Sequence, residues 1–176
     1  MLSQKLIEKA KPIKLVIFDV DGVLTDGSLF YGDDGLEYKA FNSQDGHGMK
    51  MLQNSGVDIG IITGRTSEVV THRMENLGIK HVYQGQLDKL PAFLKLTREL
   101  KVDPDEVAYV GDDVVDLPIM IRVGLAITVQ EGHDLVKKHA HWICQRPAGK
   151  GAAREICEMI MQAQGNLESM LEEYLK

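Results

Sequence analysis

Two aspartates, Asp19 and Asp21, follow an apolar run and stand two positions apart in the segment LVIFDVDGVLTDG, residues 15–27. In extended backbone, residues with this spacing point to the same side. Carboxylates this close to a core resist ionisation, because burial and like charge both favour the protonated form. A divalent cation relieves that conflict, and a set of carboxylate oxygens suits Mg²⁺. The segment therefore predicts a cation site.

Other chemically capable residues stand at the ends of further apolar runs. They are Thr63 and Gly64 in GIITGR, Lys89 in QLDKL, and Asp112, Asp113 and Asp116 in GDDVVD. Ligands of an open α/β sheet bind outside the carboxyl ends of the strands, so we expect these residues at one edge. A cation, a lysine, a hydroxyl and backbone N–H groups together can bind a phosphoryl group. The pattern points to phosphate chemistry.

The elements that must position these residues are short strands alternating with helices. We expect strands near 15–19, 58–63, 81–83, 107–110, 125–128 and 141–144, and helices near 45–54, 66–77, 88–100, 114–122, 132–138 and from 151. The strand runs do not alternate apolar with polar residues, so both faces should be buried, as in a parallel sheet. Repeated βα units predict one doubly wound, Rossmann-like α/β domain over residues 1–176 with a mainly parallel sheet.

Two segments depart from this alternation. Residues 27–42 contain two β-rich pieces around Gly32-Asp33-Asp34-Gly35, which predicts a hairpin flap just after the first strand. The tail, residues 165–176, is amphipathic, and we expect it to be mobile or to dock on a neighbouring molecule.

Composition narrows the class of protein. The net charge of −6 argues against a nucleic-acid partner, whose protein surface is usually basic. No run approaches the roughly 20 apolar residues that span a bilayer, and the N-terminus lacks the apolar stretch of a signal peptide. Cys144 and Cys157 are the only cysteines and match no metal or redox motif. We therefore expect a cytoplasmic protein with a small-molecule partner and no membrane contact.

The segments DVDGVLTD, IITG, QLDKL and GDDVVD resemble the four signature motifs of the haloacid dehalogenase superfamily of phosphotransferases. The resemblance implies that Asp19 is the nucleophile, forming an aspartyl-phosphate, and that Asp21 is the acid/base. It also implies Mg²⁺ held by Asp19, the backbone carbonyl of Asp21 and Asp112. Thr63, with Gly64, and Lys89 would hold the phosphoryl oxygens; Asp113 and Asp116 would support the metal and Lys89.

A finer resemblance concerns the branch of this superfamily that lacks a cap domain. GSLFYGDDGLEYKAFN, YQGQLDKL and RPAGKGAARE are similar to phosphatases of sugar-acid phosphates, either the eight-carbon acid of lipopolysaccharide precursor synthesis or nine-carbon acids. The chain leaves no room for a cap domain before Thr63 or between Thr63 and Lys89. Because a hairpin alone is a poor lid, we expect a homotetramer whose sites are completed by neighbouring subunits.

Several cationic residues are candidates for binding the substrate. A sugar-acid carboxylate calls for a cation that can bind it in bidentate fashion, and Arg65 is favoured over Arg73, Arg146 and Lys150.

Two alternative functions belong to classes of protein other than enzymes. A receiver-like signalling module would place its phosphorylated aspartate after the third strand, where this chain has Tyr83-Gln84-Gly85. A catalytically quiet scaffold would not need Asp19, Asp21, Thr63, Lys89 and Asp112 together. Both readings are therefore weaker than the enzyme.

Overall fold

The computed structural model describes residues 2–176. Within them, six strands form one sheet in the order β5-β4-β1-β6-β7-β8, and every neighbouring pair is parallel. The predicted doubly wound α/β fold is confirmed. The strands are β1 (Leu15–Phe18), β4 (Asp58–Ile62), β5 (His81–Tyr83), β6 (Val107–Val110), β7 (Leu125–Thr128) and β8 (Trp142–Ile143).

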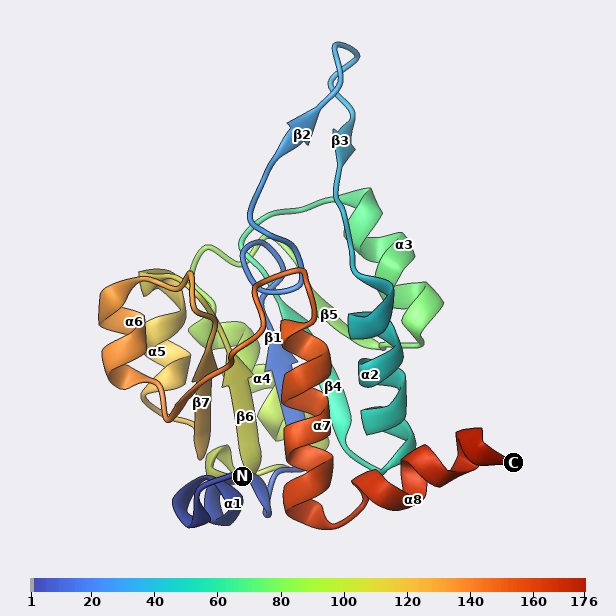
Figure 1. Ribbon diagram of the computed structural model, residues 1–176. Helices are drawn as coiled ribbons and strands as arrows, with labels where there is room; N and C mark the ends of the chain where they lie inside the picture. Colours follow the sequence, from blue (N-terminus) through green and yellow to red (C-terminus); the bar gives the residue numbers. More distant parts are fainter. Residues whose placement is uncertain (1) are drawn as a thin grey trace.

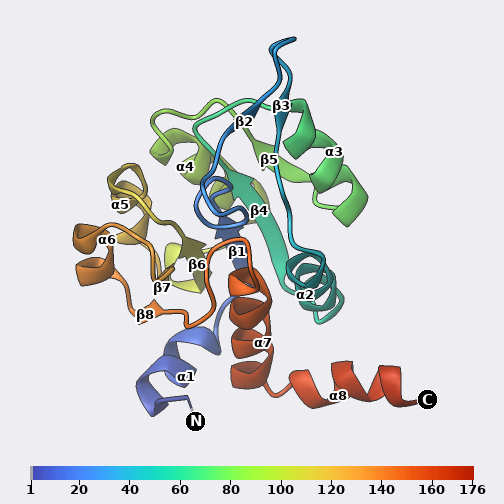
Figure 2. The same ribbon diagram turned by 45° about the horizontal axis from the view of Figure 1, so that its top comes forward.

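Helices cover both faces of the sheet (Figure 2). Along β1, Val16 and Phe18 enter one core, while Leu15 and Ile17 enter the core on the opposite face. Two buried faces explain why the strand sequences do not alternate. The first core lies under α1 (Gln4–Ala10), α2 (Ser43–Asn54), α3 (Glu68–Leu77) and α7 (Ala152–Gln164); the second lies under α4 (Leu90–Leu100), α5 (Leu117–Met120) and α6 (Asp134–His139).

Some elements differ from the sequence-based expectation. α1 was not predicted; the Ser3 side chain caps it by accepting a hydrogen bond from Leu6 N–H. The expected helix 114–122 is a 3₁₀ turn, η2 (Val114–Asp116), followed by the single turn of α5. The tail forms α8 (Leu167–Glu172) and a 3₁₀ turn, η3 (Glu173–Leu175), and Leu167 and Met170 pack against the first core. A further 3₁₀ turn, η1 (Pro104–Glu106), precedes β6.

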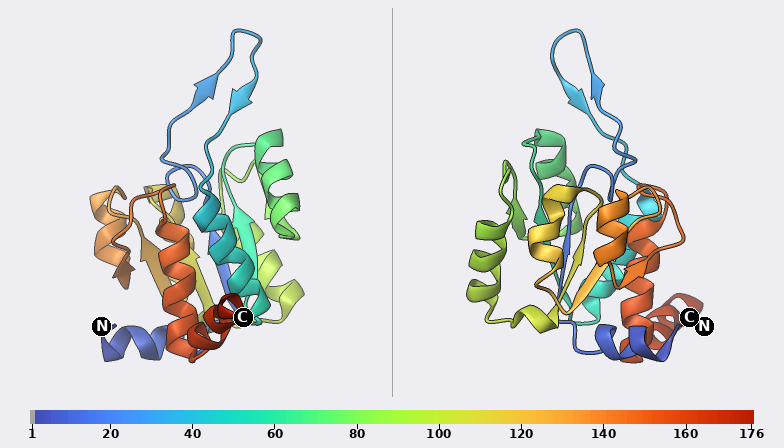
Figure 3. Two further views of the ribbon diagram at one scale, coloured as in Figure 1. Left: turned by 45° about the vertical axis from the view of Figure 1, so that its right-hand side comes forward. Right: turned by 90° about the vertical axis from the view of Figure 1, so that its left-hand side faces the viewer.

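The predicted hairpin flap is present. β2 (Phe30–Tyr31) pairs antiparallel with β3 (Glu37–Tyr38), and Gly35 turns the chain between them with a φ of +80°. Figures 1 and 3 show the flap standing away from the sheet at the end where β1 leaves it, while α1 and α8 lie at the opposite end. Among residues 2–176 we find no helix with the length and apolarity to cross a bilayer.

A buried carboxylate joins α2 to the start of α7. Asp45 on α2 is 3% exposed and accepts hydrogen bonds from the backbone N–H groups of Gly151, at 3.2 Å, and Arg154, at 2.8 Å. The N-cap of α7 is Gly151, which has no side chain to cap the helix. Asp45 therefore supplies the cap from a neighbouring helix.

Replacing Asp45 by alanine should lower the free energy of unfolding by about 1–3 kcal/mol, because two helix N–H groups lose their acceptor. Urea denaturation measures this loss. Asp45→Asn keeps one oxygen acceptor and is the matched control, which should lose less. Equal stability of Asp45→Ala and the wild type would contradict the capping role.

Candidate active site

A cleft of about 330 Å³ lies beyond the carboxyl ends of the central strands. Asp19 and Asp21 follow β1, Thr63 follows β4, and Asp112 follows β6, as the topology rule requires. Eight of the nine predicted site residues line the cleft; Asp116 lies beneath it. The lining residues are Asp19, Asp21, Thr63, Gly64, Arg65, Gln86, Leu87, Lys89, Asp112, Asp113 and Val115.

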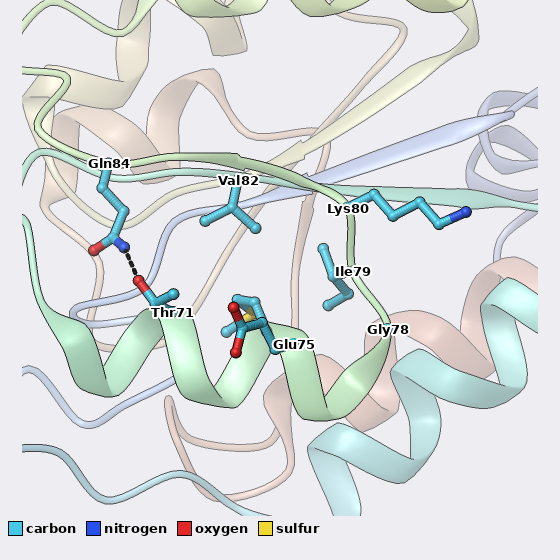
Figure 4. A pocket seen from close by; sticks show the side chains of 8 residues that line it. Thr71, Glu75, Gly78, Ile79, Lys80, Val82 and Gln84 are labelled. Carbon is cyan, nitrogen blue, oxygen red and sulfur yellow. Dashed lines mark hydrogen bonds between the residues drawn. The ribbon is translucent and has the colours of Figure 1, made fainter.

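A larger cavity, about 630 Å³, lies between α3 and the edge strand β5 (Figure 4). It is lined by Val82, Ile79 and Met74 with a few polar neighbours, among which Gln84 donates a hydrogen bond to Thr71. Its lining contains no cluster of carboxylates. The larger cavity is therefore not the candidate active site. The smaller cleft is, because its lining contains the carboxylates and the lysine.

Lys89 is the centre of the acidic cleft. It lies at the N-cap of α4 and is only 2% exposed. Its Nζ lies 2.6 Å from Asp19 Oδ2 and 2.6 Å from Asp116 Oδ1. Burial alone would lower the pKa of Lys89, but the two carboxylate charges outweigh it and the pKa is raised. The ammonium group is therefore held charged between two anions.

Asp116 organises this cluster from below. Its Oδ1 accepts hydrogen bonds from Lys89 and from the Tyr109 hydroxyl, the latter at 2.6 Å. Its Oδ2 accepts from the backbone N–H groups of Asp112, at 3.0 Å, and Asp113, at 3.2 Å. With four donors around it, this fully buried carboxylate fixes both Lys89 and the loop that presents Asp112.

The remaining charge in the cleft is unbalanced. Burial raises the pKa of Asp112 to about 7, and the charges of Asp19 and Asp116 add to the effect. Burial also raises the pKa of Asp19 to about 6, against the opposing charge of Lys89. One ammonium group thus faces three carboxylates. This is the conflict that a divalent cation relieves.

The donor set fits such a cation. Oxygens of Asp19, Asp112 and Asp116 lie within 4.8 Å of one another. Asp116 already has four donors, whereas no side chain or backbone N–H group among residues 2–176 donates to the Asp112 carboxylate. A Cβ on Gly22 would come within 2.1 Å of Asp112 Oδ2, so only glycine leaves that carboxylate its space. Asp112, and Asp19 with only one donor on each oxygen, are therefore the side chains that can ligate a cation.

Two predicted residues lie differently from the expectation. β1 ends at Phe18, so the chain is no longer extended at Asp21, and its side chain does not join the carboxylate cluster. Asp21 instead turns toward the flap, where Lys39 Nζ lies 2.5 Å from its Oδ1. Asp113 caps η2, accepting a hydrogen bond from Val114 N–H at 2.7 Å, and does not contact Lys89.

Arg65 is the one cation of the four considered that lines the cleft. Its Nη2 lies 2.9 Å from Glu37 Oε2 and also contacts the Tyr31 hydroxyl, so the flap reaches back over the site. Its Nε lies 3.8 Å from Asp21 Oδ2 and makes no hydrogen bond within the described chain.

Sequence reasoning missed Tyr109, Glu37 and Lys39. Glu37 and Lys39 stand two apart around Tyr38, the spacing that puts both on one face of a strand, and this signal was available. Tyr109 was harder to find, because the only indication in the sequence is a single hydroxyl-bearing residue within the buried strand Val107–Val110.

A profile of the haloacid dehalogenase-like hydrolase family matches residues 78–156. The chain is 45% identical over 167 residues to the 3-deoxy-D-manno-octulosonate 8-phosphate phosphatase of Escherichia coli K12, an alignment covering 95% of this chain and 89% of that protein. The structure of the Yersinia pestis enzyme of that name superposes with a TM-score of 0.93 at 44% identity, covering 95% of this chain and 90% of that one.

The Moraxella catarrhalis enzyme of the same name was solved with magnesium ion, phosphate ion and KDO. It superposes with a TM-score of 0.96 at 41% identity, covering 98% of this chain and 99% of that one. Fold and site thus define a hydrolase of the haloacid dehalogenase class. Within that class, the chain belongs to the family of 3-deoxy-D-manno-octulosonate 8-phosphate phosphatases.

Replacing Tyr109 by phenylalanine should lower the free energy of unfolding by about 1.5–3 kcal/mol, because a buried carboxylate loses a hydrogen-bond donor. Chemical denaturation measures the change. Tyr83→Phe makes the same substitution at an exposed hydroxyl that donates to Glu99 at 3.0 Å, and should cost less than about 1 kcal/mol. Equal losses in the two variants would refute the special role of the Tyr109 hydroxyl.

Proposed function

We propose that this phosphomonoesterase hydrolyses 3-deoxy-D-manno-octulosonate 8-phosphate to 3-deoxy-D-manno-octulosonate and phosphate, in lipopolysaccharide precursor biosynthesis. The observation that carries the proposal is the buried Lys89 between Asp19 and Asp116, in one cleft with the Asp112 carboxylate, in a chain so similar to relatives named for that substrate. A phosphatase for a nine-carbon sugar-acid 9-phosphate is the second candidate, since the phosphoryl-binding residues would be the same.

We propose Asp19 as the nucleophile. Its Oδ2 is held by Lys89 and its Oδ1 accepts a hydrogen bond from Val20 N–H at 2.7 Å, so the carboxylate has a defined orientation at the cleft. Attack of Asp19 on phosphorus would form an aspartyl-phosphate. Thr63, Gly64 and Lys89 line the same cleft and would receive the phosphoryl oxygens.

We propose Asp21 as the acid/base. It would give a proton to the bridging oxygen as the phosphorus–oxygen bond breaks, releasing the alcohol. It would then take a proton from the water that attacks the aspartyl-phosphate, so that ester and water become alcohol and phosphate. Asp19, Asp112 and the backbone carbonyl of Asp21 would hold Mg²⁺, which neutralises charge on the transferring phosphoryl group.

For substrate recognition, Arg65 is the proposed partner of the sugar-acid carboxylate. It lines the cleft, and its Nε has no hydrogen-bond partner among the described residues. We place the enzyme in the cytoplasm, and the free, buried state of Cys144 and Cys157 supports a reducing compartment.

The competing readings are weaker. A receiver-like module would need a phosphorylated aspartate after β5, where Tyr83 is followed by Gln84 and Gly85. A scaffold would have no use for a cleft in which one buried lysine faces three carboxylates.

The test is phosphate release from a panel: 3-deoxy-D-manno-octulosonate 8-phosphate, nine-carbon sugar-acid 9-phosphates and hexose phosphates, each with and without Mg²⁺. We expect Mg²⁺-dependent preference for the eight-carbon acid, and Asp19→Asn should abolish turnover with the fold intact. Arg65→Met should reduce the ratio of the rate of phosphate release from the sugar-acid phosphates to that from the hexose phosphates. Preference for a nine-carbon acid would favour the second candidate. A folded wild type that releases no phosphate from any of these substrates would reject the proposal that the protein is a phosphatase.

We also propose that the protein is a homotetramer in which neighbouring subunits complete each active site. The support is the flap, on which five large apolar side chains are exposed within one short hairpin, since grouped exposed apolar residues mark interaction surfaces. They are Leu29, Phe30, Tyr31, Leu36 and Tyr38.

Sedimentation analysis should therefore give four times the chain mass for the wild type. Phe30→Asp combined with Leu36→Asp should yield smaller species, because the charges cannot be buried between flaps. Asp33→Asn at the flap tip is the control and should remain assembled. A monomeric wild type at micromolar concentration would exclude the tetramer.

A further inference from the structure

Lys39 is a buried lysine for which the proposed mechanism has no task. It follows β3 at the base of the flap, and its side chain is 1% exposed. Lysine is almost never buried to this degree unless it is paired, because an uncompensated ammonium group is costly to remove from water. Its Nζ lies 2.5 Å from Asp21 Oδ1 and 2.7 Å from Glu37 Oε1.

These contacts belong to a closed set of four charges. Arg65 completes it, with Nη2 at 2.9 Å from Glu37 Oε2 and Nε at 3.8 Å from Asp21 Oδ2. Two carboxylates and two cations alternate, so the set is neutral as a whole. The Arg65 side chain is 40% exposed, so Lys39 is the inner cation of the pair and Arg65 the outer one.

The two oxygens of Asp21 are therefore not equivalent. Oδ1 accepts a hydrogen bond from the buried Lys39, whose ammonium group also forms an ion pair with Glu37. Oδ2 faces the partly exposed guanidinium of Arg65 at a distance too long for a hydrogen bond. Oδ2 is therefore the less restrained of the two oxygens in a residue that lines the cleft.

We propose that Lys39 is a positioning residue for proton transfer: it fixes Asp21 through Oδ1 and thereby presents Oδ2 to the leaving oxygen. Because Lys39 and Glu37 both lie on the flap, the position of the flap sets the position of the acid/base. Lys39 itself touches no reacting atom. The inference rests on the proposed role of Asp21, and it adds the group that orients it.

The test compares an alkyl phosphate, glycerol phosphate or the sugar-acid phosphate, with p-nitrophenyl phosphate. An alkoxide needs a proton to leave, whereas p-nitrophenolate leaves without one. In Lys39→Met, kcat/KM for the alkyl ester should fall by about 100-fold, the usual effect of misplacing a catalytic group by about 1 Å. For the aryl ester kcat/KM should fall by less than about threefold, because release of p-nitrophenolate in the first step requires no proton transfer.

Two further variants separate positioning from folding. Lys39→Arg keeps the cation and should recover most of the alkyl activity. In an Asp21→Asn background, Lys39→Met should cause no further loss on the alkyl ester, because the group it positions is already gone. Asp33→Asn, an exposed change on the same flap, should leave both substrates unaffected. If Lys39→Met does not fold, Glu37→Gln, which frees Lys39 from its second partner, should show the same selective loss in weaker form.

Equal losses on both esters, or losses that multiply with those of Asp21→Asn, would overturn the positioning role. A wild type that hydrolyses alkyl and aryl phosphates without preferring the eight-carbon acid would reject only the substrate proposed above. The comparison of leaving groups would still decide the role of Lys39. A wild type without any hydrolysis would reject both proposals.

Discussion

A single buried ammonium group holds the catalytic end of this molecule together. Lys89 is reached by carboxylates from two elements, Asp19 after β1 and Asp116 in η2, each at 2.6 Å. Removing Lys89 would leave these two carboxylates buried without a compensating charge, which is far more destabilising than the ion pairs are stabilising. The loop after β6 depends on the same contact, because Asp116 also binds the N–H groups of Asp112 and Asp113.

A second set of charges lies on the other side of the β1 turn. Asp21, Glu37, Lys39 and Arg65 form a neutral group that ties the flap to the cleft. The two sets share no residue, yet Asp19 and Asp21 are separated only by Val20. The chain turns between them because β1 ends at Phe18. As a result the Asp19 carboxylate faces Lys89 in the cleft, and the Asp21 carboxylate faces Lys39 at the base of the flap. One short segment can thereby serve nucleophilic attack and proton transfer separately.

Much of this arrangement could be predicted from the sequence. The parallel sheet follows from apolar runs such as Val107–Val110, and the position of Thr63, Lys89 and Asp112 at one edge follows from the rule for open sheets. The roles of Asp113 and Asp116 could not be separated, because they depend on which of the two carboxylates turns inward after Gly111. There a Cβ would meet the Asp116 side chain at 2.4 Å, so the close approach requires glycine.

The flap contacts could not be foreseen because a hairpin pattern does not say where the hairpin leans. Lys39 is an ordinary charged residue in the sequence and a 1% exposed side chain in the fold. α1 could not be predicted for a similar reason. Its amphipathic pattern is short, and the helix is stabilised by packing on α7 rather than by its own helix propensity.

The central claim is that Asp19, one of the two carboxylates held by Lys89, receives the phosphoryl group. The most direct measurement is to quench the enzyme with acid during turnover, reduce it with borohydride and examine the peptides by mass spectrometry. Reduction converts an aspartyl-phosphate to homoserine, and we expect homoserine at position 19 alone. Homoserine at Asp21 or Asp112, or none in an enzyme that is turning over, would contradict the account.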